Sequence, residues 1–284
     1  MPAHEHVHAP ALPAMGPVTL LRALLKRPQR HRQAGMPPLE TLYRLDRLPR
    51  DEVARYRAAF GFTGERIPVT WWYLIAQRAH LATMLEPGFP FRIVGLVHMD
   101  NTLAEHGPVN PDRPLALRTV LRLLPPSANG ALRCALETTG SADGISVFTC
   151  TSTYLIRRGA RRDGQRAETP DAPAGEPVAQ WTLDGAAGRR YARLSGDWNP
   201  IHLVGWSARL MGMRAPIIHG MHTLAAACAE LEKHAGRHAT GIACRFRAPV
   251  ALGSSVSLRT GAEPGDFLVE AGGKPAVTGR CILA

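Results

Sequence analysis

The chain has 284 residues, enough for one large domain or two of ordinary size. Hydrophobic residues make up 45% of it and charged residues 20%, as in a soluble globular protein, and no apolar run is long enough to span a bilayer. The net charge of +11 raises the question of nucleic-acid binding, but Lys and Arg are dispersed and no recognised nucleic-acid-binding motif is present. We therefore expect no specific nucleic-acid partner.

Residues 1–34 read as a leader that we expect to be partly disordered. Within it, residues 18–25 predict a short amphipathic helix on the surface. Arg22 interrupts the apolar residues of this segment, and Lys26 and Arg27 follow them. A secretory signal places its charges first and an uninterrupted apolar core second, so we expect a cytoplasmic protein.

Neither the histidines of the leader nor the cysteines predict a metal site. His4, His6 and His8 alternate, but they lie in a Pro/Ala-rich segment with no cysteine nearby, which favours a disordered tail. The five cysteines are scattered without a Cys-x-x-Cys spacing and mostly lie in apolar stretches, as small buried side chains do in a reducing compartment. We expect no metal and no cofactor.

A charged segment rich in Gly, Pro and Ala, residues 157–177, predicts an interdomain linker. It separates an N-terminal domain, residues 35–156, from a C-terminal domain, residues 178–284. The two halves repeat each other in outline, because a long apolar-rich helix candidate at 71–85 recurs 149 residues later at 220–231. We expect two copies of one helix-then-strands unit.

Strand-like runs punctuated by Gly, Pro and Asn follow both helix candidates, as in antiparallel meanders. In the first half they are residues 92–99, 115–124, 131–138 and 145–156, and in the second half 242–247, 255–260, 266–270 and 276–283.

The most informative segment is Tyr191 to His202, with the sequence YARLSGDWNPIH. It places a carboxylate, Asp197, and an imidazole, His202, five positions apart, and Pro200 prevents an uninterrupted helix between them. The two side chains therefore lie on a turn where both can approach one water molecule, an arrangement suited to general acid–base chemistry near neutral pH. A plain helix-capping turn is the alternative.

This segment, followed by His219-Gly220-Met221 at the start of the second helix, resembles the MaoC-like (R)-specific enoyl-thioester hydratase/dehydratase family. The specific match covers about residues 191–231, with a looser one at residues 245–250. The resemblance implies an α+β chain with a tandem (double) hot-dog fold, in which a long helix in each half is wrapped by an antiparallel sheet. The first half lacks the Asp/His turn and is degenerate, so we expect one active site per chain.

The resemblance implies a hydro-lyase of fatty-acid metabolism that hydrates trans-2-enoyl thioesters or dehydrates (3R)-hydroxyacyl thioesters. Asp197 and His202 would act through one water, and which of them takes the proton is open because the pair can titrate as a unit. Gly220, at a helix N-terminus, would offer its N–H to the thioester oxygen.

Further residues are assigned to substrate binding. Ser195 and Asn199 are expected to fix the turn that carries Asp197, and Met221 lies beside Gly220. The remaining candidates each have an equal or more common alternative: Trp71, Trp72 and Met84 line the acyl pocket or form ordinary core, and Arg245 and Arg247 meet phosphate or are surface arginines.

Two other functions stay open: an acyl thioesterase on the same fold, and a non-catalytic acyl-thioester-binding protein. The expected partner is an acyl-CoA or acyl-carrier-protein substrate, whose negative charge suits the basic chain. Chain length, the carrier, the physiological direction and pairing into a homodimer are left open.

Overall fold

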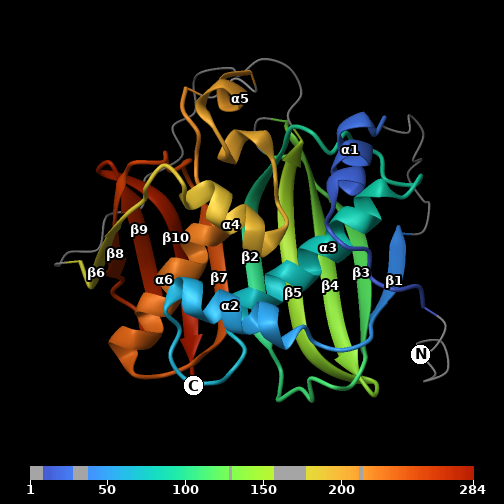
Figure 1. The fold of residues 1–284 in the computed structure, drawn as a ribbon, viewed down its shortest axis with the longest axis horizontal. Coiled ribbons are helices and arrows are strands. Elements are labelled where there is room, and N and C mark those ends of the chain that lie inside the picture. The colour runs from blue at the N-terminus through green and yellow to red at the C-terminus, as the bar shows by residue number, and fades with distance from the viewer. Residues whose placement is uncertain (1–8, 28–37, 128–129, 157–176, 211–213) are drawn as a thin grey trace. The chain divides into compact units, whose positions relative to one another are not determined.

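The computed structural model describes residues 9–27, 38–127, 130–156, 177–210 and 214–284 (Figure 1). The histidines at 4, 6 and 8 and nearly all of the predicted linker lie outside these residues. The chain divides into two compact units: unit 1 comprises residues 1–51 and 71–159, and unit 2 comprises residues 52–70 and 160–284. The predicted domain limits stay a prediction, and residues 52–70 group with the second unit.

Unit 1 is built on one long helix against an antiparallel sheet. Helix α3 (Trp72–Leu85) has eleven of its fourteen side chains buried, because its sequence is apolar nearly all round, and it contacts β1, β3, β4 and β5. The strands run in the order β1-β3-β4-β5-β2. Their bounds are β1 (Glu40–Leu45), β2 (Leu96–Glu105), β3 (Leu115–Leu124), β4 (Leu132–Ala142) and β5 (Ile145–Ile156).

The leader contributes the predicted amphipathic helix, α1 (Pro17–Leu25). Ala23 is buried, whereas Val18, Leu21, Leu24 and Leu25 are exposed. Nζ of Lys26, just past the helix, donates to the carbonyl oxygens of Leu85 and Glu86 at 3.1 and 2.6 Å, which ties α1 to the end of α3.

Unit 2 repeats this plan. Helix α6 (Gly220–Ala235) lies against β7 and β10 (Figure 1). Its small residues, such as Ala225, Ala227 and Cys228, are fully buried. The strands run in the order β7-β10-β9-β8-β6. Their bounds are β6 (Ala179–Thr182), β7 (Ala239–Phe246), β8 (Ser255–Thr260), β9 (Asp266–Ala271) and β10 (Lys274–Leu283).

The smaller helices of unit 2 are α4 (Ala187–Ser195), the 3-10 turn η2 (Pro200–His202) and α5 (Gly205–Leu210). Helix α2 (Arg50–Phe60) also belongs to unit 2, except for its first two residues. A further 3-10 turn, η1 (Val69–Trp71), precedes α3.

The predicted internal repeat is confirmed at the level of topology. In each unit a first strand, a long helix and four further strands follow one another along the chain, and the sheet order is first, third, fourth, fifth, second. Within each unit, the named strands pair with one another in the antiparallel sense. The α+β tandem architecture expected from the sequence is therefore present, with one long helix against one antiparallel sheet in each unit.

The strands at 115–124, 145–156 and 255–260 have the predicted bounds, but the first predicted strand was wrong at its start. Residues 92–95 are not part of it, and β2 begins only at Leu96. The reason is Gly95, whose φ of +93° places a turn at that point. All five cysteines are buried and free, as predicted. No helix in the described part of the chain is long and apolar enough to cross a membrane.

His80 on α3 makes a testable prediction about stability. Its side chain is 1% exposed, neither ring nitrogen has a hydrogen-bond partner among the described residues, and burial, with a smaller effect of His98, lowers its pKa from 6.5 to about 3. The unfolded chain binds a proton near pH 6.5 but the folded chain does not, so stability is fully present above that pH and falls as the pH is lowered towards 3.

Each pH unit in this window costs up to about 1.4 kcal/mol for one such group. Urea unfolding at pH 7.5 and pH 5 should therefore show a smaller drop in unfolding free energy for His80→Phe, which cannot titrate, than for the wild type. An identical drop in both proteins would show that His80 titrates normally in the folded state.

Candidate active site

The segment from α4 to η2 is a tightly hydrogen-bonded turn that presents Asp197. Helix α4 ends at Gly196, whose φ of +74° is the left-handed conformation that glycine adopts without strain. Oγ of Ser195 donates to the carbonyl oxygen of Tyr191 at 2.9 Å and accepts the N–H of Asp197 at 3.2 Å. Oδ1 of Asp197 accepts the N–H of Asn199 at 3.1 Å. These bonds fix the backbone on both sides of the carboxylate.

His202 ends the same turn and is held from its other side. Asn199 caps η2 by accepting the N–H of Ile201 at 3.4 Å. Nδ1–H of His202 donates to the carbonyl oxygen of Ile217 at 2.9 Å, and the N–H of Ile217 donates to the carbonyl oxygen of Ile201 at 3.1 Å. Because Nδ1 carries the proton, Nε2 holds the lone pair of the neutral ring.

The two side chains differ in their exposure to water. The Asp197 side chain is 33% exposed, so water reaches it, whereas His202 is 8% exposed. Burial lowers the pKa of His202, and the Asp197 carboxylate and the Ile217 carbonyl oppose that shift. His202 is thus neutral at neutral pH, beside a carboxylate that reaches solvent.

His219, the residue before α6, joins this pair. Its Nε2–H donates to the backbone carbonyl oxygen of Asp197 at 2.9 Å and lies 4.0 Å from Oδ2 of the carboxylate. Its ring stacks on that of His202, with centroids 3.7 Å apart and an interplanar angle of 28°. Burial, followed by the neighbouring His202, lowers the pKa of His219 to about 3. The turn and the start of α6 are therefore locked together.

Asp197, His202 and His219 have the spacing of a metal-binding triad, since their ligand atoms lie within 4.8 Å of one another. The hydrogen bonds argue against that use. Nε2 of His219 must carry a proton to donate to a carbonyl oxygen, which only accepts, and a protonated nitrogen has no lone pair for a metal. The predicted absence of a metal stays a prediction.

Gly220 is the first residue of α6 and is exposed, while Met221 beside it is 4% exposed. A Cβ at position 220 would come within 2.8 Å of the Phe246 ring, so glycine allows this ring to pack against the helix start. The amide of Gly220 lies in the first turn of a 16-residue helix, where N–H groups lack partners within the helix.

The other predicted binding residues lie elsewhere. Trp71 and Trp72 are at most 1% exposed in unit 1, where their rings meet edge to face at 5.3 Å, and Trp72 stacks on Phe148 at 4.6 Å. Met84 belongs to another buried cluster of that unit. Arg245 and Arg247 are exposed, and Arg247 donates to Oγ1 of Thr278 at 3.2 Å. Contact of any of these with substrate stays a prediction.

Sequence reasoning missed two residues that shape the site. It placed His219 at the start of the second helix without predicting its contacts with Asp197 and His202, and it did not consider Gly188 in α4. A Cβ at Gly188 would overlap the carbonyl oxygen of His202, so only glycine lets α4 approach the turn this closely. The position of His219 directly before the predicted helix was the one available signal for its role. Nothing in the sequence marked Gly188.

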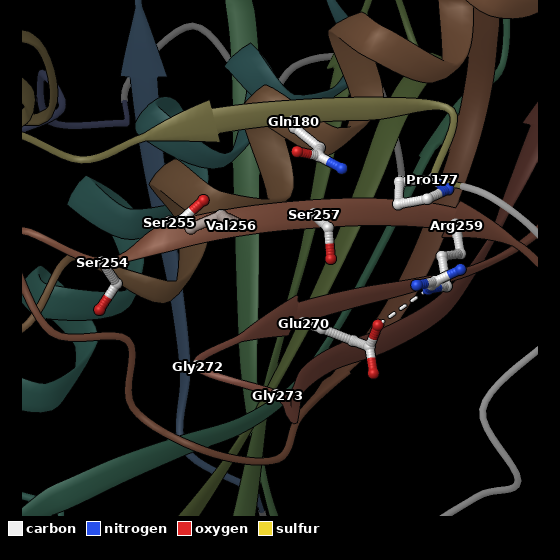
Figure 2. A pocket seen from close by; sticks show the side chains of 10 residues that line it. All are labelled: Pro177, Gln180, Ser254, Ser255, Val256, Ser257, Arg259, Glu270, Gly272 and Gly273. Carbon is white, nitrogen blue, oxygen red and sulfur yellow. Dashed lines mark hydrogen bonds and ion pairs between the residues drawn. The ribbon is translucent and has the colours of Figure 1, made fainter.

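A separate hollow of about 450 Å³ lies over β6, β8 and β9 in unit 2 (Figure 2). Gln180, Ser257, Arg259 and Glu270 line it, and Arg259 forms an ion pair with Glu270 at 2.9 Å. None of the predicted site residues borders this hollow, so we do not assign it to the Asp197 site.

Comparison with known proteins agrees with this geometry. Residues 167–264 match the MaoC-like domain model. The chain is 28% identical over 219 residues to 3-hydroxyacyl-thioester dehydratase X of Mycobacterium tuberculosis, covering 75% of this chain and 78% of that protein.

Residues 167–264 are a MaoC-like domain. The crystal structure of HtdX from Mycobacterium tuberculosis superimposes with a TM-score of 0.70 at 25% identity, over 84% of this chain and 98% of that one. A MaoC-like dehydratase from Phytophthora capsici gives a TM-score of 0.68 at 18% identity, over 88% and 96%. The fold is therefore the hot-dog fold of the MaoC-like dehydratases, and the Asp197–His202 turn lies within the matched domain.

The close approach at Gly188 yields a prediction for the MaoC-like domain. Gly188→Ala should lower the free energy of unfolding by about 1–3 kcal/mol, because the added methyl group forces the His202 turn away from α4. Urea unfolding measures this loss.

The matched control is Gly185→Ala, an exposed position just before α4 where an added Cβ meets nothing within 4 Å. Equal stability of the two variants would mean that the turn tolerates displacement and that the contact at Gly188 is not tight.

Proposed function

We propose that this protein is a hydro-lyase that adds water to trans-2-enoyl thioesters and, in reverse, dehydrates (3R)-hydroxyacyl thioesters. The observation that carries the proposal is the turn that holds the Asp197 carboxylate beside the neutral imidazole of His202 within a MaoC-like domain. The relative that is named a 3-hydroxyacyl-thioester dehydratase supports the same reaction class.

In the hydration direction, one water lies between Asp197 and His202. As its oxygen bonds to C3 of the substrate, the pair takes its proton, and the electrons of the C2–C3 double bond move towards the thioester carbonyl to give an enolate. The pair then returns a proton to C2, which leaves a 3-hydroxyacyl thioester. A single water and a single acid–base pair deliver hydroxyl and proton to the same face of the double bond. The (3R) outcome is implied by the family resemblance.

Two features of unit 2 suit these steps. Lowering of the His202 pKa by burial keeps the ring neutral at neutral pH, so that either member of the pair can accept the proton. The N–H of Gly220, an exposed residue at the positive end of α6, is the donor for the thioester oxygen as it gathers negative charge. Asp197, His202 and Gly220 are accordingly the proposed catalytic residues.

Substitutions of Asp197 and His202 test the acid–base pair. Asp197→Asn and His202→Ala should each lower kcat for hydration of crotonyl-CoA by about 10²–10⁴-fold, because each removes one half of the acid–base pair. Loss of the enoyl absorbance follows the reaction. Asp266→Asn, which removes a half-buried carboxylate paired with Arg280, is the control and should retain activity. Near-normal hydration by either site variant would refute the pair.

Thiol release separates hydration from hydrolysis. Wild-type protein should consume crotonyl-CoA without releasing free thiol, and an (S)-specific 3-hydroxyacyl-CoA dehydrogenase should not oxidise the product. Thiol release in step with substrate loss would establish the thioesterase alternative. Acyl-CoA binding without turnover would establish the non-catalytic one.

The carrier of the substrate, CoA or an acyl carrier protein, is proposed only as a class. The net charge of +11 suits either of these anionic carriers. A cytoplasmic location and pairing into a homodimer likewise stay predictions.

A further inference from the structure

We propose that His219 is a positioning residue that fixes Asp197 and His202 relative to each other. It holds Asp197 by a hydrogen bond to its backbone and His202 by stacking on its ring. The inference rests on the proposed function, because it concerns how that pair is kept ready for one water. His219 is a buried titratable group that contacts both members of the pair and that the mechanism does not use.

The hydrogen bond to Asp197 is the first element of the argument. Nε2–H of His219 spans 22 positions of sequence to reach the carbonyl oxygen of Asp197 at 2.9 Å. The bond is made by a side chain that is 4% exposed, so water competes with it poorly. It fixes the backbone from which the carboxylate projects, while Ser195 and Asn199 fix the same backbone from within the turn.

The ring stack is the second element. One neighbour of the His219 ring is His202, at a centroid distance of 3.7 Å, and another is Tyr191 of α4, at 4.8 Å and 56°. Tyr191 in turn contacts His222 at 5.5 Å and Phe60 at 6.1 Å, and is 2% exposed. The His219 ring is thus confined by packing, and it confines the ring of His202.

His219 does not itself carry a proton in the reaction. Its Nε2–H is engaged by a carbonyl oxygen, and its Nδ1 has no hydrogen-bond partner among the described residues. Burial and the adjacent His202 keep the ring neutral, with a pKa of about 3. A second proton on this ring would lie in the stack against His202, so the neutral form is the one that the packing allows.

His219 also directly precedes Gly220, the proposed donor to the thioester oxygen. His219 occupies the N-cap position of α6, with φ −61° and ψ 135°, and its carbonyl oxygen accepts the N–H groups of His222 and Thr223 at 3.1 and 3.3 Å. The next amide along the chain is that of Gly220. One anchored residue therefore sets the acid–base pair and the helix start relative to each other.

Three variants separate the two contacts. His219→Phe keeps an aromatic ring in the stack but loses the hydrogen bond; His219→Gln keeps an N–H donor but loses the ring; His219→Ala loses both. We expect kcat for crotonyl-CoA hydration to fall by about 10²-fold in the alanine variant with little change in KM, because a displacement of about 1 Å costs that much. The glutamine variant should recover part of the loss. His222→Gln is the matched control. His222 is a half-buried histidine of the same aromatic cluster whose ring contacts Tyr191 and Phe60, and the variant should retain kcat.

The pH profile gives a readout that a merely structural role would not move. Asp197 faces His202 from its own turn, and the Ile217 carbonyl and the His219 ring face it from the segment before α6. The Arg189 guanidinium binds the neighbouring carbonyl oxygen of Leu203. Removing the ring of His219 admits water to His202, which raises the pKa of His202 towards its ordinary value. In the pH profile of kcat, the fall on the acid side should therefore move to higher pH in the alanine and glutamine variants. It should stay in place in the phenylalanine variant.

Nitrogen NMR of the imidazoles in the wild-type protein tests the geometry without any assay of activity. We expect His219 as the Nε2–H tautomer and His202 as the Nδ1–H tautomer, with no titration of His219 between pH 5 and 8, well above its pKa of about 3. Titration of His219 near neutral pH, or unchanged kcat in both the alanine and phenylalanine variants, would overturn the inference. A wild-type protein with these tautomers but no hydration activity would refute the proposed function instead and leave His219 anchoring an inactive turn.

Discussion

Two backbone carbonyl oxygens determine which ring nitrogen carries the proton in each histidine of the candidate site. A carbonyl oxygen only accepts hydrogen bonds, so the Ile217 carbonyl requires a proton on Nδ1 of His202, and the Asp197 carbonyl requires one on Nε2 of His219. Burial opposes a second proton on either ring. Both imidazoles of the site are therefore neutral, and Nε2 of His202 keeps the free lone pair beside Asp197. Everything proposed for the chemistry depends on this assignment.

The two units share one topology but differ in what precedes the long helix. In unit 2, His219 precedes α6 and joins the Asp197 turn, whereas in unit 1, Trp71 precedes α3 and is fully buried. The same helix-on-sheet unit thus carries polar chemistry at one helix start and apolar packing at the other. Unit 1 still contains a buried histidine, His80, but it lies within α3 and has no hydrogen-bond partner among the described residues.

The sequence predicted those features that depend on local pattern. Strand-like runs between turn residues, such as β3, β5 and β8, were placed to the residue. The Asp-x-Asn-Pro-x-His string placed Asp197 and His202 on one turn. Strands β1 and β6 were missed, because ETLYRL carries two charges and AQWT has only four residues. The role of His219 was missed because its partner is a backbone carbonyl 22 positions away, and Gly188 because only the folded structure brings α4 against His202.

Neutral buried histidines link the stability of the fold to the state of the site. His80, His202, His219 and His222 all have lowered pKa values, chiefly because burial disfavours their charged forms. Below about pH 6.5 the unfolded chain gains protons at these positions that the folded chain does not, so acid favours unfolding. The same burial keeps His202 ready to accept a proton at neutral pH. A substitution that admits water to the stack would therefore relieve the acid sensitivity of the fold and raise the pKa of His202 together, because one cause, desolvation, produces both effects.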